Sequence, residues 1–429
     1  MEIAQLYDLY LQHPSVQTDT RRLKPGDLFF ALAGPSFDGN SFALQALEQG
    51  SSFAIIDNAE YAKNEKCIVV SNVLETLQQL AAYHRSHFSI PFIAITGSNG
   101  KTTTKELVTT VLQKRFKTYA TEGNLNNHIG VPLTLLKIRE DAEMAVVEMG
   151  ANHRHEIECY CKIARPTHGI LTNCGKAHIE GFGGEEGVRK GKGELYDFLR
   201  EHEGAIFRNS DLPYLEEMAK GIGEQITYGS SNAKYIGKAL MGDMFLKVAV
   251  LTSGEETSIQ TNLVGNYNFP NVMVAVAVGL HFGVSIDAIR EALQAYSPDN
   301  SRSQYMEVGT NKVILDAYNA NPTSMRAAIG NFAQSSTQNK LLWIGAMKEM
   351  GEAEEQEHRE LVEHIAQYKW EDVILVGKEF YGLNGGYKWF ENSTGAAEFV
   401  KGHKPTDAAI LIKGSRGSKM EHLLEALKG

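Results

Sequence analysis

The segment from Phe92 to Glu106 constrains the fold of this chain more than any other part of the sequence. It reads FIAITGSNGKTTTKE, so a run of β-forming residues leads through a glycine turn into a helical pattern. A strand that ends in such a turn directs backbone N–H groups and a helix N-terminus at an anion. The segment therefore predicts an α/β fold with a nucleotide phosphate site between a strand and a helix.

The glycine turn departs from the standard phosphate-binding pattern G-x-x-x-x-G-K-[ST], which would place a glycine at position 95. That position is Ile95, and the first glycine is Gly97, so the loop is two residues shorter. Lys101 is expected to reach the outer phosphates, and Thr102 is placed to ligate Mg²⁺. The loop residues expected to contact the nucleotide are Gly97, Ser98, Asn99, Gly100, Lys101, Thr102 and Thr103.

Composition excludes several classes of function. The chain has 429 residues, a length that suggests roughly three domains, and 22% of them are charged and 43% hydrophobic, an ordinary balance for a soluble globular protein. The net charge of −10, without a basic block, argues against a nucleic-acid partner. The sequence contains neither an apolar run of membrane-spanning length nor a signal-peptide pattern, so no membrane insertion is expected. Four cysteines without a disulfide-like framework favour a reducing cytoplasm.

Strand and helix patterns divide the chain into three parts. Residues 1–88 hold short apolar runs between helical patterns and predict a small α/β domain. Residues 89–298 alternate strand and helix patterns, which predicts a central domain with a mostly parallel sheet. Ser297–Ser301 is polar and contains a proline, as linkers often do. Residues 299–429 alternate again and predict a Rossmann-like, doubly wound domain.

Three titratable residues lie at or after predicted strand ends in the central part. Glu148 lies at the C-terminal tip of the β-forming run Ala145–Met149, where a carboxylate could ligate Mg²⁺ or cap a helix. His178 follows another strand in a glycine-rich loop, a position that favours a metal or phosphate contact over a place in the core. Lys192 stands between two glycines and has, by composition, the character of an ordinary surface lysine.

Two polar clusters occur later in the chain. Asn268 and Asn271 precede a helix of small residues, where carboxamides could contact a nucleobase or cap the helix. The run Asp316–Met325, DAYNANPTSM, follows a strand and enters a helix. Asx-turns and caps account for its end but not for the polar residues before it, so it is a candidate active-site segment.

The phosphate loop and several other stretches resemble the Mur ligase family of peptidoglycan synthesis. The loop sequence TGSNGKTTTKE is similar to the ATP loop of that family, and the resemblance covers essentially the whole chain. The run DAYNANPTSM resembles the branch of the family that adds D-alanyl-D-alanine. The other matching stretches are TEGNLNNHIGVPLTLL (Thr121–Leu136), VEMGANH (Val147–His153), AHIEGFG (Ala177–Gly183) and, in a UDP-sugar domain, Asp19–Arg21 with Pro25–Phe29.

The resemblance implies a reaction and its substrates. ATP would phosphorylate the terminal carboxylate of a UDP-N-acetylmuramoyl-tripeptide, and the amine of D-alanyl-D-alanine would attack the acyl phosphate to form an amide. A carboxylate that approaches a triphosphate brings two anions together, so charge neutralisation is the main catalytic requirement. The family also implies two Mg²⁺ ions, and we expect the protein to act as a monomer.

The resemblance assigns roles to single residues. Thr102 and Glu148 would hold the first magnesium, and His178 would contact the second. Lys192, in a Lys-Gly-Glu setting, would be carbamylated with CO₂ and support the second magnesium; Lys190 is a nearby competitor without that setting. The resemblance also implies contacts with the nucleotide: Asn268 and Asn271 would contact adenine, and Arg302 and Asp316 would reach the nucleotide from the third domain. Asn319 and Asn321, with Tyr318 beside them, would contact the dipeptide, and Thr20 and Arg21 would contact the UDP-sugar. Substrate contacts are also implied for Asn124, Asn126 and Asn127, and a phosphate or carboxylate contact for Ser415 and Arg416.

Two other functions stay open at the level of sequence. A sister amide ligase, such as folylpolyglutamate synthase or the enzyme that adds the third amino acid, would share the ATP loop, although DAYNANP argues against both. A nucleotide-regulated switch without ligase activity would also use such a loop. His178, Lys192 and a third α/β domain would have no purpose in such a switch.

Overall fold

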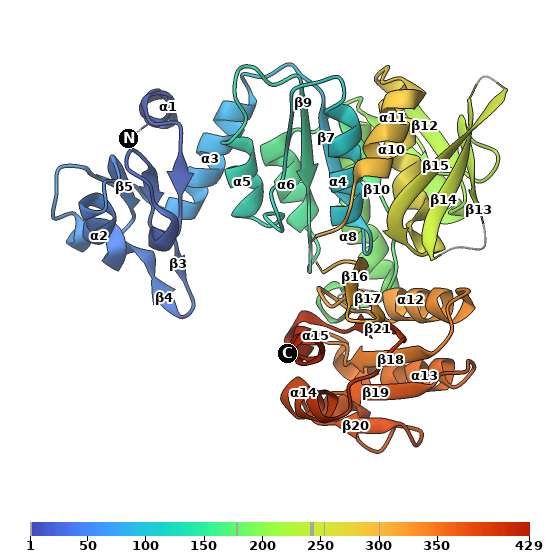
Figure 1. The fold of residues 1–429 in the computed structure, drawn as a ribbon. Helices are drawn as coiled ribbons and strands as arrows, with labels where there is room; N and C mark the ends of the chain where they lie inside the picture. Colours follow the sequence, from blue (N-terminus) through green and yellow to red (C-terminus); the bar gives the residue numbers. More distant parts are fainter. Residues whose placement is uncertain (1, 177–178, 241–243, 253, 300) are drawn as a thin grey trace.

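The computed structural model describes residues 2–176, 179–240, 244–252, 254–299 and 301–429. In these ranges the chain forms three main sheets, each with its own helices (Figure 1). His178, for which we expect a metal contact, lies outside the described residues. Among the helices in these ranges, none has the length and apolar character needed to cross a bilayer.

The first sheet belongs to the N-terminal part and is parallel, in the order β1-β2-β5-β6. The strands are β1 (Val16–Gln17), β2 (Leu28–Phe30), β5 (Phe53–Ile56) and β6 (Cys67–Val69), and a small hairpin consists of β3 (Ala33–Gly34) and β4 (Phe37–Asp38). The helices are α1 (Ile3–Gln12), α2 (Ala43–Glu48) and α3 (Val73–Arg85). Leu6, Leu28 and Leu77 belong to one apolar cluster that continues into the central sheet, so this part is joined to the next by a shared core.

The central sheet has the order β15-β14-β13-β12-β11-β10-β7-β9-β8. Pairing is parallel from β8 to β13, and β14 and β15 complete one edge by antiparallel pairing. The strands are β7 (Phe92–Thr96), β8 (Thr118–Ala120), β9 (Met144–Glu148), β10 (His168–Leu171), β11 (Ala205–Asn209), β12 (Glu224–Gly229), β13 (Tyr235–Leu240), β14 (Phe245–Thr252) and β15 (Glu255–Val264). The expectation of a mostly parallel sheet is confirmed, whereas the antiparallel edge was not expected.

The two faces of the central sheet carry separate cores. Side chains alternate along a strand, and on β7 Phe92 and Ala94 pack in one cluster while Ile93 and Ile95 pack in the other. This double burial explains why the strand reads as an unbroken apolar run. The central helices are α4 (Lys101–Leu112), α5 (Gly130–Leu135), α6 (Glu156–Ala164), α7 (Ile179–Phe182), α8 (Glu185–Glu201), α9 (Pro213–Met218), α10 (Phe269–His281) and α11 (Ile286–Ala295).

The third sheet has the order β16-β17-β21-β18-β19-β20 and is parallel except for the edge strand β16. Its strands are β16 (Gln304–Val308), β17 (Asn311–Asp316), β18 (Lys340–Gly345), β19 (Asp372–Val376), β20 (Lys388–Phe390) and β21 (Ala409–Lys413). Helices α12 (Pro322–Gln334) and α13 (Glu354–Ile365) pack on one face, and α14 (Ser393–Gly402) and α15 (Glu421–Lys428) pack on the other. The predicted doubly wound architecture is therefore confirmed.

Candidate active site

The phosphate loop connects β7 to α4 and needs glycine at two positions. Gly97 has φ 139°, and a Cβ there would collide with the Thr172 hydroxyl. Gly100 has φ 80° at the N-cap of α4, and a Cβ there would lie 2.6 Å from Asn271 Oδ1. Other residues rarely adopt these backbone angles, so both positions require glycine for the close approach of neighbouring segments.

The adjacent strand β10 holds the loop in place. Asn173, which follows β10, accepts two hydrogen bonds from the loop. The Ser98 N–H donates to its carbonyl oxygen (2.8 Å), and the Asn99 N–H donates to its Oδ1 (3.1 Å). Lys101 donates to the loop carbonyls of Gly97 (2.7 Å) and Ser98 (3.2 Å). Desolvation lowers the pKa of Lys101 from 10.5 to about 8, although the nearby Glu148 carboxylate opposes this shift.

Glu148 lies at the tip of β9, next to the loop. Its Oε1 accepts from the Thr102 hydroxyl (3.1 Å) and from Asn126 Nδ2 (2.7 Å). Its Oε2 is buried and has no hydrogen-bond partner among the residues that the structure describes. A buried carboxylate oxygen without a partner, next to a threonine hydroxyl, is a donor set of hard oxygens that suits Mg²⁺.

Lys192 is deeply buried, unlike the surface lysine that its composition suggested. The side chain is on α8, is 1% exposed and donates to Ala151 O at 2.7 Å. Burial, with the charge of Lys101 as a second cause, lowers its pKa from 10.5 to about 7. The competitor Lys190 lies on the outer side of α8, where it pairs with Glu186 at 2.7 Å.

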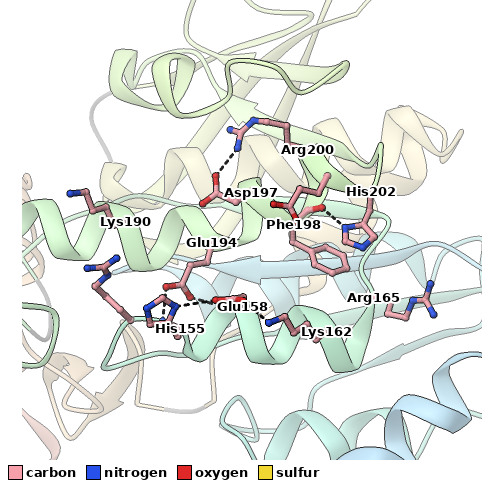
Figure 2. A pocket seen from close by; sticks show the side chains of 12 residues that line it. His155, Glu158, Lys162, Arg165, Lys190, Glu194, Asp197, Phe198, Arg200 and His202 are labelled. Carbon is pink, nitrogen blue, oxygen red and sulfur yellow. Dashed lines mark hydrogen bonds and ion pairs between the residues drawn. The ribbon is translucent and has the colours of Figure 1, made fainter.

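Glu194 fixes α8 to the segment that follows Glu148. Figure 2 shows its carboxylate at the N-terminus of α6, where it accepts from the backbone N–H groups of His155 (2.6 Å) and Glu158 (3.0 Å). Lys190 and Glu194 line this outer, charged hollow between α6 and α8, away from the phosphate loop. The Lys192 amine is therefore directed inward by two independent contacts of α8 with the 151–158 segment.

The third domain brings charged residues to the same region. The Arg302 guanidinium stacks on the Tyr318 ring at 3.8 Å, and Arg416 approaches this ring at 5.4 Å. Asp316, at the end of β17, pairs with Lys413, at the end of β21, at 2.5 Å. These cationic groups and the carboxylate end at the carboxyl edge of the third sheet, where doubly wound domains bind ligands.

The asparagines expected at the nucleotide and dipeptide are held by neighbouring groups. Asn271 Nδ2 donates to Asn268 Oδ1 (2.9 Å), and Asn268 Nδ2 donates to Val264 O (2.9 Å). Asn321 caps α12 and also donates from Nδ2 to Asn99 Oδ1 of the phosphate loop (2.7 Å). Asn321 thus combines the expected helix cap with a contact between domains.

One cavity of about 700 Å³ collects most of the expected site residues. It is lined by residues of the central and third domains, among them the phosphate loop and the Asp316–Ser324 segment. The expected residues in its lining are Ser98, Asn99, Gly100, Lys101, Thr102, Thr103, Asn124, Asn126, Asn127, Glu148, Asn268, Asn271, Arg302, Asp316, Tyr318, Asn319 and Asn321.

Some expected residues lie apart from this lining. Arg21, next to Thr20 in the N-terminal domain, is exposed and pairs with Asp19 at 2.6 Å. The Ser415 hydroxyl donates to Ala346 O at 2.7 Å, and Arg416 lines a neighbouring hollow beside Tyr318. Gly97 and Lys192 are also outside the lining, although Gly97 precedes the lining residue Ser98 and Lys192 donates to the lining residue Ala151.

The structure adds detail to one expected segment and brings forward two further cavity residues. Lys413 begins the run Lys413–Gly417, for which the sequence suggests a phosphate or carboxylate contact; it lines the cavity, is 2% exposed and neutralises Asp316. The pairing with Asp316 was not expected from the sequence. Asn209, the last residue of β11, and Asp211, which follows that strand, also line the cavity, but no motif marks them.

Comparison with known families supports this geometry. Three family models match in succession: "Mur ligase family, catalytic domain" over residues 14–85, "Mur ligase middle domain" over 95–279, and "Mur ligase, glutamate ligase domain" over 301–416. The matches cover the three parts that carry the three sheets. The chain belongs to the Mur ligase family.

Particular relatives are similar over almost their whole length. UDP-N-acetylmuramoyl-tripeptide–D-alanyl-D-alanine ligase of Bacillus subtilis (strain 168) is 32% identical, over 96% of this chain and 92% of the relative. The ligase of the same name from Escherichia coli (strain K12) is also 32% identical, over 96% and 93%. The crystal structure of MurF from Acinetobacter baumannii superposes with a TM-score of 0.87 at 31% identity, over 96% and 93%. The MurF ligase of Thermotoga maritima, in complex with ADP, shares the fold with a TM-score of 0.87 at 24% identity.

Proposed function

We propose that this protein is an ATP-dependent ligase that joins D-alanyl-D-alanine to a UDP-N-acetylmuramoyl-tripeptide, forming a peptide bond. The observation that carries this proposal is the common cavity, because the phosphate loop and the Asp316–Ser324 segment both line it. The relatives named for this reaction support it over nearly the full chain. The run DAYNANPTSM, which suggested the dipeptide, lines the same cavity as the phosphate loop, and this supports a role for it in binding the acceptor.

The chemistry that fits the cavity is carboxylate activation. In this proposal the tripeptide carboxylate attacks the terminal phosphate of ATP, the bond to ADP breaks, and an acyl phosphate forms. The dipeptide amine then adds to the acyl carbon, loses a proton, and the tetrahedral adduct collapses to an amide with release of phosphate. Lys101 and Arg302 are positioned to neutralise the charge that accumulates on the phosphate oxygens.

Thr102 and Glu148 are the residues that would hold a magnesium ion. Their oxygens converge, and Glu148 Oε2 has no protein partner in the described ranges. Bound there, Mg²⁺ would supply charge neutralisation between the phosphates and the incoming carboxylate. Asn126 keeps the carboxylate oriented by its hydrogen bond to Oε1.

Carbamylation of Lys192 is a second element of the proposal. A lysine amine adds CO₂ only when it is unprotonated, and a pKa of about 7 leaves about half of the Lys192 amines unprotonated at neutral pH. The product would be a carboxylate on the end of the lysine, a ligand type suited to a second magnesium. His178 would be the partner of this second ion by family resemblance.

Domain closure is the third element. The N-terminal domain shares an apolar core with the central domain, and the core of the third domain includes Val264 of the central domain. Beside the phosphate loop, by contrast, the third domain makes polar contacts. Each domain would bring one substrate, with the UDP-sugar near Thr20 and Arg21, so the three must come together for reaction. We propose a monomer in the cytoplasm, where its free thiols at Cys67, Cys159, Cys161 and Cys174 would stay reduced.

Release of phosphate from ATP tests this function. We expect release only when UDP-N-acetylmuramoyl-tripeptide and D-alanyl-D-alanine are both present. Equal release with D-alanyl-D-alanine replaced by a single amino acid would point to a sister ligase. Release without either substrate would point to a nucleotide switch.

A further inference from the structure

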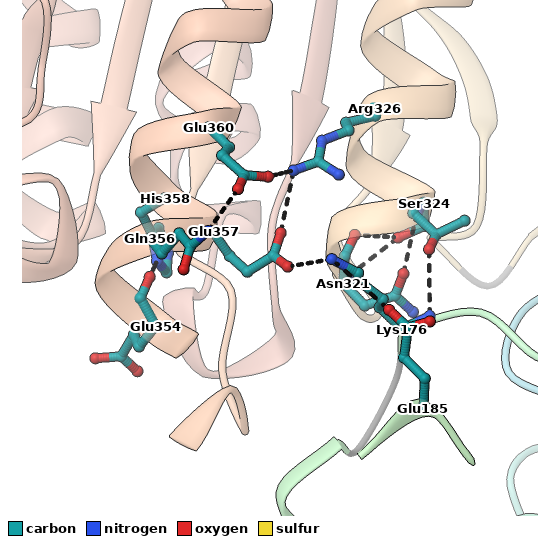
Figure 3. Close-up of polar contacts among 11 residues, drawn as sticks. Lys176, Glu185, Asn321, Ser324, Arg326, Glu354, Gln356, Glu357, His358 and Glu360 are labelled. Carbon is teal, nitrogen blue, oxygen red and sulfur yellow. Dashed lines mark hydrogen bonds and ion pairs between the residues drawn. The ribbon is translucent and has the colours of Figure 1, made fainter. Parts of the chain in front are cut away.

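A buried carboxylate on α13 joins the third domain to the central domain. The Glu357 side chain is only 5% exposed, although it belongs to a helix whose first turn is strongly acidic. Its Oε1 pairs with Lys176 Nζ of the central domain at 2.9 Å, and its Oε2 pairs with Arg326 of α12 at 3.1 Å. Figure 3 shows Glu357 between these two cations, with Glu360 contacting the same guanidinium nitrogen of Arg326.

The central-domain partner is close to the phosphate loop. Lys176 lies three residues after Asn173, whose carbonyl and side chain hold the loop N–H groups of Ser98 and Asn99. The Lys176 backbone N–H also donates to Thr323 Oγ1 at the start of α12 (3.3 Å). The bridge formed by Lys176, Glu357 and Arg326 therefore attaches the third domain to the segment that supports the ATP loop. It lies beside the hydrogen bond from Asn321 to Asn99.

The two halves of the bridge differ in what they stabilise. Arg326 has a second carboxylate partner, Glu360, at 2.6 Å, so the pairing inside the third domain persists without the central domain. The Lys176–Glu357 pair exists only when the two domains are in contact. A charge-assisted hydrogen bond to a buried carboxylate is among the stronger polar contacts, so it shifts the equilibrium toward the docked arrangement.

We propose that Glu357 and Lys176 are positioning residues that dock the third domain onto the support of the phosphate loop during catalysis. Neither residue lines the cavity, so neither is placed to touch the reacting atoms. Their effect passes through the docked arrangement, which brings Arg302 and the Asp316–Ser324 segment to the ATP loop. This inference rests on the proposed ligase function.

A double-mutant cycle in the full-length protein tests the proposal. The variants are Lys176→Met, Glu357→Gln and the double variant, and Glu360→Gln is the control because its hydrogen bonds in the described ranges are to Arg326 and Gln356, both of the third domain. We expect kcat/KM for dipeptide addition to fall about tenfold in each single variant, as for loss of one charge-assisted hydrogen bond. The double variant should fall no further, because the same contact is already broken. The loss should lie mainly in kcat, since docking must follow substrate binding in every cycle.

The cycle separates docking from a purely structural role. Lys176 is outside the third domain, so a fold defect of that domain would affect Glu357→Gln alone and would contradict the proposal. Independent losses that multiply to about a hundredfold in the double variant would also overturn it. Lys176→Arg, which keeps the charge, should stay within about threefold of the parent protein, and a tenfold loss in it would count against docking. If the parent protein lacks phosphate release dependent on both substrates, the ligase function itself fails.

Discussion

Substitution of Lys192 by alanine tests the most unusual element of the proposed site. The buried amine has a pKa of about 7 in place of 10.5, so the unprotonated fraction at pH 7 rises to about one half, roughly a thousandfold above that of an exposed lysine. Lys192→Ala removes this amine and leaves space beside Ala151 O and the Phe182 ring. We expect kcat to fall about 10²- to 10³-fold, as for loss of one charged group that supports the transition state.

The assay combines phosphate release with chemical rescue. Acetate or formate can occupy the space left by the side chain and restore a carboxylate there. We expect either of them to raise the activity of Lys192→Ala at least about tenfold above its activity without added carboxylate. In the parent protein, labelled bicarbonate should give a carbamate signal by NMR that Lys192→Ala lacks. Since protonation blocks CO₂ addition, the signal should weaken as pH falls through about 7 and strengthen above it.

The matched control is Lys190→Ala, which removes an exposed lysine two residues earlier, on the outer side of α8, and should leave activity unchanged. Full activity in Lys192→Ala would refute the reasoning outright. An inactive Lys192→Ala that no short carboxylate restores, with an unchanged fold by circular dichroism, would show that the amine acts as a cation or as a packing group.

Three further predictions concern the cavity and the domains. Glu148→Gln removes the charge but not the shape of the proposed magnesium ligand, so the rate of phosphate release should fall about a hundredfold and rise again at higher Mg²⁺ concentration. The control Glu122→Gln, on the surface, should leave that rate unchanged. Lys413→Met leaves Asp316 without its buried partner and should weaken nucleotide binding and lower stability by about 3 kcal/mol; unchanged thermal unfolding would contradict this assignment. Small-angle scattering should show compaction when an ATP analogue and the UDP-tripeptide bind together, and an unchanged radius of gyration would contradict domain closure.

The local parts of the site were predictable from the sequence. A strand, a glycine turn and a helix are encoded by neighbouring residues, so Phe92–Thr102 could be assigned before the structure was known. Glu148 could be placed at a strand tip for the same reason, because the end of an apolar run is visible in the sequence. The three-part division of the sheets likewise follows from strand–helix alternation.

Features that depend on distant pairing were not predictable. Lys413 pairs with Asp316 across 97 residues, and Lys176 pairs with Glu357 across 181 residues. Composition assigned Lys192 to the surface, and only the packing of α8 shows its burial; the family resemblance, not the residue pattern, drew attention to it. The antiparallel edge formed by β14 and β15 was missed because their alternating pattern resembles that of any half-buried strand.

Mass spectrometry of the UDP-linked product tests the central claim most directly. The purified protein, with ATP and Mg²⁺, should convert UDP-N-acetylmuramoyl-tripeptide to a species heavier by one D-alanyl-D-alanine less one water. With the carboxylate of the tripeptide labelled with heavy oxygen, one label should appear in the released phosphate, as an acyl phosphate requires. A product that contains a different amino acid, or phosphate without label, would contradict the account.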